Sequence, residues 1–295
     1  MFNQLGLIGC GLMGGSFALA LKRAGKVRRV VGYSKSPSTT ERARQLGIID
    51  TVAESALLAV SGSDIVLIAV PVAASEATFK AIRQLVEPGV LLMDVGSTKS
   101  DVVDAARRVL KERIGWFVPA HPIAGKEASG ILNADASLYA GRLAILTPLE
   151  ENAPEALQRA REAWTAVGSQ VLEMSVPRHD AAFAAVSHLP HLLAFAYLNA
   201  IAAQADAAAE YLGLAGPGFR DFTRIAASDP LVWRDILLAN RAEVGRQTAH
   251  FRAALDAIEH AMASGDGSAL QGLIETASSA RAAWQMSSDG RPAAR

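Results

Sequence analysis

Three sets of residues in this chain of 295 residues have types and spacings suited to chemistry. A glycine-rich turn occupies residues 9–14, between a short apolar run and an alanine- and leucine-rich segment. His121 directly follows the apolar run 116–120, and Arg224 follows a glycine-rich loop. These features suit, in turn, phosphate binding, proton transfer near neutral pH and carboxylate binding. The pattern therefore predicts a small-molecule substrate.

The glycine-rich turn has the spacing of a dinucleotide-binding motif. Gly9 permits a sharp turn, Gly11 lets the backbone approach a pyrophosphate, and Gly14 lets helix and strand pack closely. The N-terminus of the following helix offers unpaired N–H groups and a partial positive charge to the phosphates. A glycine-rich turn without a ligand is the alternative. The cofactor-binding residues expected here are Gly9, Gly11, Leu12, Met13 and Gly14.

The end of the second predicted strand bears on which dinucleotide binds. An acidic residue there would bind the adenosine ribose hydroxyls and favour NAD. This chain has Ser34 and Lys35 instead, a hydroxyl and a cation that suit the 2′-phosphate of NADP. If Lys35 is only a solvated loop residue, NAD binds through other ribose contacts, so NAD and NADP both stay open. Val70 and Pro71 end a continuous apolar run, expected to be a central parallel strand whose end faces the cofactor.

Two residues are candidates for catalysis. His121 is expected at the end of a parallel strand, beside the nicotinamide pocket. Its ordinary pKa of about 6.5 suits proton transfer near neutrality. Ser97 follows another strand end, where it either caps the next helix or contacts the nicotinamide or the substrate.

The second half contains a long segment, 179–209, that is apolar almost all round. Such a helix is usually buried in a helical domain or an oligomer. Pro190 is expected to kink it and to free backbone carbonyls near His188. His188 and His191 lie on one helix face, but no acid or cysteine cluster accompanies them, so no metal site is predicted.

Two arginines follow the glycine-rich loop of the second half. Arg220 and Arg224 suit the binding of a carboxylate by a planar, bidentate donor. The alternative is a surface ion pair with Asp221.

The order of predicted elements defines the fold class. Strands alternate with helices in the first half, and Trp116–Ala120, Leu143–Pro148 and Gln170–Met174 are expected to be its last strands, the last of them closing the sheet. No clear strand follows Pro177. We therefore predict an α/β fold, with a Rossmann-type doubly wound, mostly parallel sheet in residues 1–174 and an all-helical domain in residues 175–295.

Composition excludes several functional classes. The 29 basic and 29 acidic residues give zero net charge, so neither a nucleic-acid partner nor an anionic membrane surface is expected. The single cysteine rules out an internal disulfide and fits a reducing compartment. No apolar run reaches the roughly 18 residues of a membrane helix, and no charged leader is evident. We expect a cytoplasmic protein that does not contact a membrane.

Five motifs occur together in an order that resembles the prephenate and arogenate dehydrogenases of tyrosine biosynthesis. The resemblance covers roughly residues 4 to 285 and implies oxidative decarboxylation, with hydride transfer to NAD or NADP, and an all-α dimerisation domain that makes the protein a homodimer. The motifs are G-C-G-L-M-G at 9–14, D-V-G-S-T-K at 94–99, H-P-I-A-G at 121–125, S-H-L-P-H at 187–191 and D-F-T-R at 221–224.

The resemblance also assigns roles to single residues. His121 matches the catalytic histidine that takes the proton of the ring hydroxyl. Ser97 matches a serine that orients the histidine and the hydroxyl relative to each other. His188 matches a substrate-binding histidine, and Arg224 an arginine that holds a substrate carboxylate. The remaining expected substrate-site residues are Arg220 and Asp221, a charged network at the site mouth, Trp233, which reaches in from a partner subunit, and Lys126, where some members have threonine.

Two other functions are compatible with the glycine-rich turn. The β-hydroxyacid dehydrogenases share a G-x-G-x-M-G turn and a helical second domain, but they need a catalytic lysine on the first long helix after the sheet. Residues 179–209 contain no lysine, which counts against that class. A dinucleotide-sensing module without activity gives no reason for a histidine and an arginine at the cleft.

Overall fold

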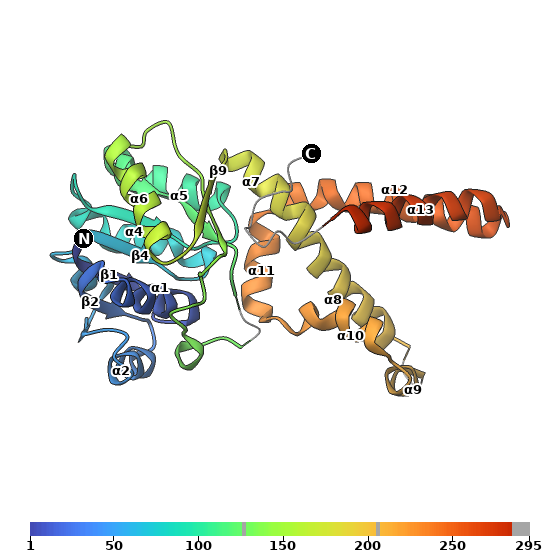
Figure 1. Ribbon diagram of the computed structural model, residues 1–295, viewed down its shortest axis with the longest axis horizontal. Coiled ribbons are helices and arrows are strands. Elements are labelled where there is room, and N and C mark those ends of the chain that lie inside the picture. The colour runs from blue at the N-terminus through green and yellow to red at the C-terminus, as the bar shows by residue number, and fades with distance from the viewer. Residues whose placement is uncertain (126–127, 205–206, 285–295) are drawn as a thin grey trace.

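The computed structural model describes residues 1–125, 128–204 and 207–284. An α/β part carries the N-terminus, and a helical part lies beside it (Figure 1). Six parallel strands form one sheet in the order β3-β2-β1-β4-β5-β6, which reverses direction between β1 and β4. Ligands bind at such a reversal in open α/β sheets. These strands are β1 (Phe2–Ile8), β2 (Val27–Tyr33), β3 (Thr51–Val52), β4 (Ile65–Ile68), β5 (Leu91–Asp94) and β6 (Phe117–Val118).

Helices cover both faces of the sheet, so its central strands are apolar throughout rather than alternating. In β4, Ile65 and Leu67 join one core, while Val66 and Ile68 join the core on the other face. The first core includes residues of α1 (Leu12–Arg23), α2 (Pro37–Gln45) and α6 (Pro154–Ala166). The second includes residues of α3 (Ala56–Val60), α4 (Ser75–Ile82) and α5 (Ser100–Leu110).

The last strands of the first half differ from the sequence-based expectation. The segment Trp116–Ala120 is not one strand, because the chain leaves the large sheet at Pro119, which has no N–H to donate to a ladder. Strands β7 (Ala120–Pro122), β8 (Leu143–Leu146) and β9 (Gln170–Glu173) form a separate three-stranded sheet, with β7 antiparallel to β8. The expectation that Gln170–Met174 closes the large sheet was wrong.

The helical half begins with a long helix that is interrupted once. Helix α7 (Val176–Phe183) passes through a π-helical turn, Ala184–His188, into α8 (Leu189–Ala202). Pro190 lies in the first turn of α8, where its missing N–H is tolerated. The helix was expected to kink at Pro190, and its irregular part is the π-helical turn just before it. The remaining helices are α9 (Ala208–Gly213), α10 (Pro217–Thr223), α11 (Pro230–Ala239), α12 (Arg241–Ala263) and α13 (Gly267–Ala283).

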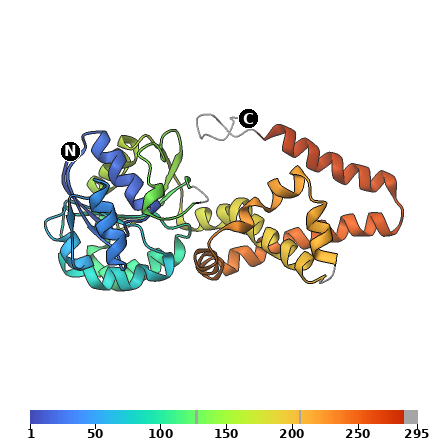
Figure 2. The same cartoon turned by 90° about the horizontal axis from the view of Figure 1, so that it is seen from below.

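Much of the helical half is exposed in the single chain. Helices α12 and α13 project from the body as a pair (Figure 2), and no residue of α13 within the described range is buried. The span Val176–Ala202 is long and apolar enough to cross a membrane by length and composition. Of its most apolar window, 28% is buried inside the structure. Ser187, His188, His191 and Asn199 interrupt the span, so the expectation that no uninterrupted apolar run reaches about 18 residues is not contradicted.

The three motif glycines meet different surroundings. Gly9 has φ 97°, and a Cβ there would lie 2.2 Å from the Ala69 carbonyl oxygen. A Cβ on Gly14 would lie 2.3 Å from the Gly9 carbonyl oxygen. At Gly11, which precedes α1 in extended conformation, a Cβ would have no atom within 4 Å. Gly9 and Gly14 are therefore required by the fold, whereas Gly11 is not.

We predict that Gly14→Ala lowers the stability of the protein and that Gly11→Ala leaves it nearly unchanged. In Gly14→Ala, the overlap with backbone should outweigh the roughly 1 kcal/mol gain in helix propensity and lower the free energy of unfolding by about 1–3 kcal/mol. Gly11→Ala should change it by less than about 1 kcal/mol. Denaturant titration of both variants measures the difference, and equal stabilities would contradict the argument.

Candidate active site

Two hollows adjoin at the carboxyl ends of the parallel strands. The smaller, of about 380 Å³, lies between the glycine-rich turn, the end of β4 and the loop after β5. The larger, of about 820 Å³, lies between the segment that follows β7 and the helical half. Ser97 and Gly125 line both hollows, so ligands in the two would meet there.

The smaller hollow fits a dinucleotide. Gly11 lines it, and the open space at its Cβ position leaves room for a ligand against the backbone. Helix α1 begins there, and its first-turn N–H groups suit phosphate. Val232 and Ile236 of α11 line the hollow from the helical half. Of the expected cofactor residues, Gly11, Leu12, Met13, Val70, Pro71 and Ser97 line it.

Ser34 and Lys35 lie away from that lining, at the end of β2. The Ser34 hydroxyl accepts a hydrogen bond from the Cys10 backbone N–H at 2.8 Å, which ties the strand end to the glycine-rich turn. The Lys35 side chain is exposed. Neither Ser34 nor Lys35 brings a carboxylate to this strand end that would repel a 2′-phosphate.

His121 lies in β7, lines the larger hollow and is buried on its other sides. Its Nδ1 lies 2.9 Å from Nε2 of His179, whose Nδ1 lies 2.8 Å from Oδ1 of Asp180. The ring of Phe183 packs against both histidines, with centroids 4.6 Å from each. Burial, then the neighbouring His179, Lys99 and His188, holds the pKa of His121 well below its usual value, so it is neutral at pH 7.

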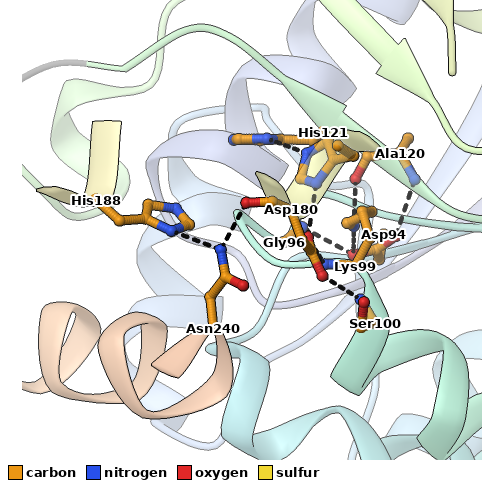
Figure 3. A network of polar contacts seen from close by, with 10 residues as sticks. Asp94, Gly96, Lys99, Ser100, Ala120, His121, Asp180, His188 and Asn240 are labelled. Atoms are coloured by element: carbon orange, nitrogen blue, oxygen red, sulfur yellow. Dashed lines mark hydrogen bonds and ion pairs between the residues drawn. The ribbon is translucent and has the colours of Figure 1, made fainter. Parts of the chain in front are cut away.

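A buried ion pair supports the strand that carries His121 (Figure 3). The Lys99 ammonium is fully buried and donates to Asp94 and, at 2.7 Å, to the Ala120 carbonyl. Asp94 also accepts hydrogen bonds from the backbone N–H groups of Ala120, at 3.0 Å, and Gly96, at 2.8 Å. The peptide before His121 and the loop before Ser97 are thus held by the same pair of side chains.

Asp180 caps helix α5 from the helical half. Its carboxylate accepts from the backbone N–H of Lys99 at 2.9 Å and of Ser100 at 2.8 Å. Burial alone would raise the pKa of Asp180, but hydrogen bonds from His179, Ser100 and Lys99 lower it to about 2. The alternative in which Ser97 caps this helix was wrong, since the cap position is Lys99 and Ser97 lines the hollows instead.

His188 lies behind the wall of the larger hollow, with 1% of its surface exposed. Its Nδ1 lies 3.1 Å from the side-chain amide nitrogen of Asn240, which also donates to the Asp180 carbonyl at 2.8 Å. Its Nε2 has no hydrogen-bond partner among the described residues, although the nearby backbone of Ser97 favours the charged form of the ring. Desolvation lowers the pKa of His188 to about 4. Its role in substrate binding stays a prediction.

Trp233 and His191 stack on one wall of the larger hollow, with ring centroids 3.5 Å apart. The His191 Nδ1–H donates to the Ser187 carbonyl at 2.9 Å. Trp233 was expected to reach into the site of a partner subunit, but it lines the cleft of its own chain. Helix α11 carries it there because the helical half folds back against the end of β4.

The expected carboxylate-binding residues separate into two groups. Arg224 lines the larger hollow. Arg220 pairs with Asp221 at 3.1 Å, both side chains are about 70% exposed, and neither lines a hollow described above, so the surface ion pair is the correct alternative for them. Lys126 lies outside the described residues.

The sequence analysis missed the polar residues that hold His121 and His188. Asp94 and Lys99 are the ends of the D-V-G-S-T-K motif but were given no role, and the pair His179-Asp180 stands out in an apolar segment. Within the described ranges, no group of three or more potential metal ligands is present. The missed residues are Asp94, Lys99, His179, Asp180 and Asn240.

A glycine-rich turn suited to phosphate at the sheet reversal, with a neutral histidine in the adjoining hollow, is the arrangement expected of a nicotinamide-dependent oxidoreductase with a Rossmann fold. Comparison with known proteins identifies the family. Residues 17–173 match the nucleotide-binding domain of prephenate dehydrogenase, and residues 175–276 match its dimerization domain. The chain belongs to the prephenate dehydrogenase family.

Individual relatives agree with this assignment. The chain is 33% identical to the cyclohexadienyl dehydrogenase of Zymomonas mobilis over 99% of both chains. It is 36% identical to the prephenate dehydrogenase of Bacillus subtilis, over 83% of this chain but only 66% of that protein. The crystal structure of prephenate dehydrogenase from A. aeolicus, in complex with hydroxyphenyl propionate and NAD+, superposes with a TM-score of 0.88 at 33% identity. It covers 95% of this chain and 97% of that chain.

The buried histidines predict that stability falls in mild acid. Their pKa values are lowered in the folded state, so below about pH 6.5 the unfolded chain binds more protons, and stability is lost as the pH falls further. For His188 alone, a pKa of about 4 implies a loss of about 2 kcal/mol between pH 7 and pH 5.

Denaturant unfolding at fixed protein concentration measures this loss. His188→Gln should show a smaller difference between the two pH values than the parent protein. Identical pH dependence in the parent and the variant would contradict the burial argument.

Proposed function

We propose that this protein oxidises and decarboxylates prephenate, giving 4-hydroxyphenylpyruvate, carbon dioxide and a reduced nicotinamide cofactor. One observation carries the proposal most directly. His121 lines the larger hollow, and that hollow meets the hollow beside the glycine-rich turn at Ser97 and Gly125. A proton acceptor and a hydride acceptor can therefore reach the same ring carbon and its hydroxyl from two sides.

The reaction needs little driving force from the protein, because loss of carbon dioxide makes the ring aromatic. Bound NAD(P)+ supplies the hydride acceptor. His121 takes the proton of the ring hydroxyl as the hydride leaves the carbon that bears it. The electrons of the broken carbon–carboxylate bond enter the ring and complete the aromatic system. The protein's own contribution is then orientation of the ring and removal of one proton.

Arg224 is proposed to hold the carboxylate of the pyruvyl side chain. It lines the hollow that contains His121, and a guanidinium forms strong charge-assisted hydrogen bonds with carboxylates. A ring carboxylate left without such a partner is better prepared to depart as carbon dioxide. We propose that arogenate, which has an amino group in place of the side-chain keto group, is also accepted. The end-to-end match to a protein named cyclohexadienyl dehydrogenase supports this wider substrate class.

The proposed cofactor range includes NADP as well as NAD. Support comes from the end of β2, where Ser34 replaces a carboxylate and Lys35 is an exposed cation close to it. A 2′-phosphate would meet no negative charge from these residues.

A homodimer is the proposed assembly. The matched dimerization domain includes α12 and much of α13, where apolar side chains such as Met262 and Ile274 are more than half exposed. Burial of this surface in a second copy would remove it from water, which favours association. A cytoplasmic location is also proposed. The only cysteine, Cys10, is a buried thiol whose pKa is raised by burial to about 11.

The function is tested with purified protein, prephenate or arogenate, and NAD or NADP. Reduced cofactor should accumulate with prephenate, and His121→Asn should lower kcat roughly 100- to 10,000-fold while leaving cofactor affinity nearly unchanged. Absorbance at the wavelength of the reduced nicotinamide measures both. Absence of turnover with all four combinations would refute the function, and near-parental kcat in the variant would refute the role of His121.

The proposal for NADP predicts the effect of an added carboxylate. Ser34→Asp should lower kcat/KM for NADP and shift the preference towards NAD, because the new charge repels a 2′-phosphate. Ser36→Asn, an exposed uncharged change two residues on, is the matched control. An unchanged ratio of the two kcat/KM values in Ser34→Asp would place the 2′-position away from this strand end.

A further inference from the structure

We infer that Asp180 and His179 are positioning residues that hold His121 in the tautomer whose Nε2 is free to accept a proton. The inference rests on the proposed role of His121 as the base. It concerns residues that lie behind the cleft, since neither His179 nor Asp180 lines the larger hollow. Their contacts form a chain of hydrogen bonds that begins at a carboxylate and ends at the base (Figure 3).

The first step is the direction of the bond between Asp180 and His179. An ionised carboxylate only accepts hydrogen bonds, and Asp180 is held ionised by two backbone N–H groups of α5. The ring nitrogen 2.8 Å from its Oδ1 must therefore carry hydrogen, so Nδ1 of His179 is the donor. A neutral imidazole carries one hydrogen only, which leaves Nε2 of His179 as an acceptor.

The second step transfers this constraint to His121. Because Nε2 of His179 accepts, the Nδ1 of His121 that lies 2.9 Å from it must donate. His121 then carries its hydrogen on Nδ1, and the lone pair lies on Nε2. Nε2 makes no hydrogen bond to a described residue, while the residue lines the larger hollow. The nitrogen left for the substrate hydroxyl is thus the one that can accept its proton.

The charged and titratable groups around the pair favour this arrangement. Lys99 faces both histidines and disfavours a second positive charge on either ring, as does burial. His188 disfavours a positive charge on His121. Asp94 and Asp180, in contrast, favour a positive charge on His179. If His179 were protonated, both of its nitrogens would donate. His121 would then have its hydrogen on Nε2 and could not act as a base.

The hydrogen bonds from His121 through His179 to Asp180 also account for the proton that leaves the substrate hydroxyl. The substrate hydroxyl proton forms a new N–H bond at Nε2 of His121, which becomes an imidazolium. Its Nδ1–H continues to donate to His179, and Asp180 supplies the nearest compensating negative charge through that ring. The proton returns from Nε2 to solvent through the hollow after the product leaves, so neither His179 nor Asp180 changes its protonation state.

The test compares two replacements of His179 that differ in the acceptor they offer. His179→Gln keeps an acceptor, because the side-chain carbonyl oxygen can receive the Nδ1–H of His121. His179→Met fills a similar volume without a comparable acceptor. We expect kcat to fall about 10- to 1,000-fold in His179→Met and only a few-fold in His179→Gln, with the KM for NAD nearly unchanged in both. Gln45→Met, an exposed change on α2 in the α/β half, is the control.

A second measurement separates this role from a purely structural one. Nitrogen NMR of protein labelled at histidine distinguishes a protonated Nδ1 from a protonated Nε2, and His121→Asn identifies the signals of His121. The parent protein and His179→Gln should show hydrogen on Nδ1 of His121, and His179→Met should show it shifted to Nε2. This readout needs no turnover, so it remains valid if the proposed reaction is wrong. Hydrogen on Nε2 in the folded parent, or a near-parental kcat in His179→Met, would overturn the inference.

Discussion

The carboxylate of Asp180 is the interaction on which the site depends. It belongs to α7 of the helical half, yet it caps α5 of the α/β half through two backbone N–H groups. An uncapped helix N-terminus in a buried setting would leave those donors without partners, at a cost of about 1–3 kcal/mol each. The same carboxylate orients His179. One side chain therefore joins the two halves of the protein at the point where the base must be held.

The buried pair of Lys99 and Asp94 positions the chain before His121 more than it stabilises the fold. Removing two charges from water costs several kcal/mol per ion, and attraction between them does no more than offset this cost. The gain lies in geometry, because Asp94 replaces the strand ladder that Pro119 interrupts and receives the Ala120 N–H. Lys99 holds the carbonyl of the same residue. The interruption lets the chain turn out of the large sheet, so that His121 pairs with β8 in the smaller sheet and lines the larger hollow.

Features of the fold and the site could be predicted from the sequence where they depend on neighbouring residues, but not where they depend on contacts between residues far apart in the chain. The glycine-rich turn is a local pattern, and the structure places it where the spacing indicated. The parallel strand expected before His121 was wrong, because the run divides at Pro119 and His121 lies within β7, which is antiparallel to β8. The chain of Asp180, His179 and His121 joins residues 58 positions apart, and no periodicity records such a contact. The separate sheet was missed because the apolar runs of β8 and β9 look alike whichever sheet they join. The exposed pair Arg220–Asp221 was open to two interpretations, and burial alone distinguishes them.

These contacts explain why the base and the cofactor site are built from one framework. Ser97 lines both hollows and lies between Asp94 and Lys99, the two residues that position the peptide before His121. Helix α11 contributes to both hollows as well, through Val232 and Ile236 in one and Trp233 in the other. A shift of the helical half would therefore move the cover of the cofactor hollow, a wall of the substrate hollow and the anchor of His179 together. The proposed hydride and proton acceptors would thus be aligned by the same packing contact rather than by two independent ones.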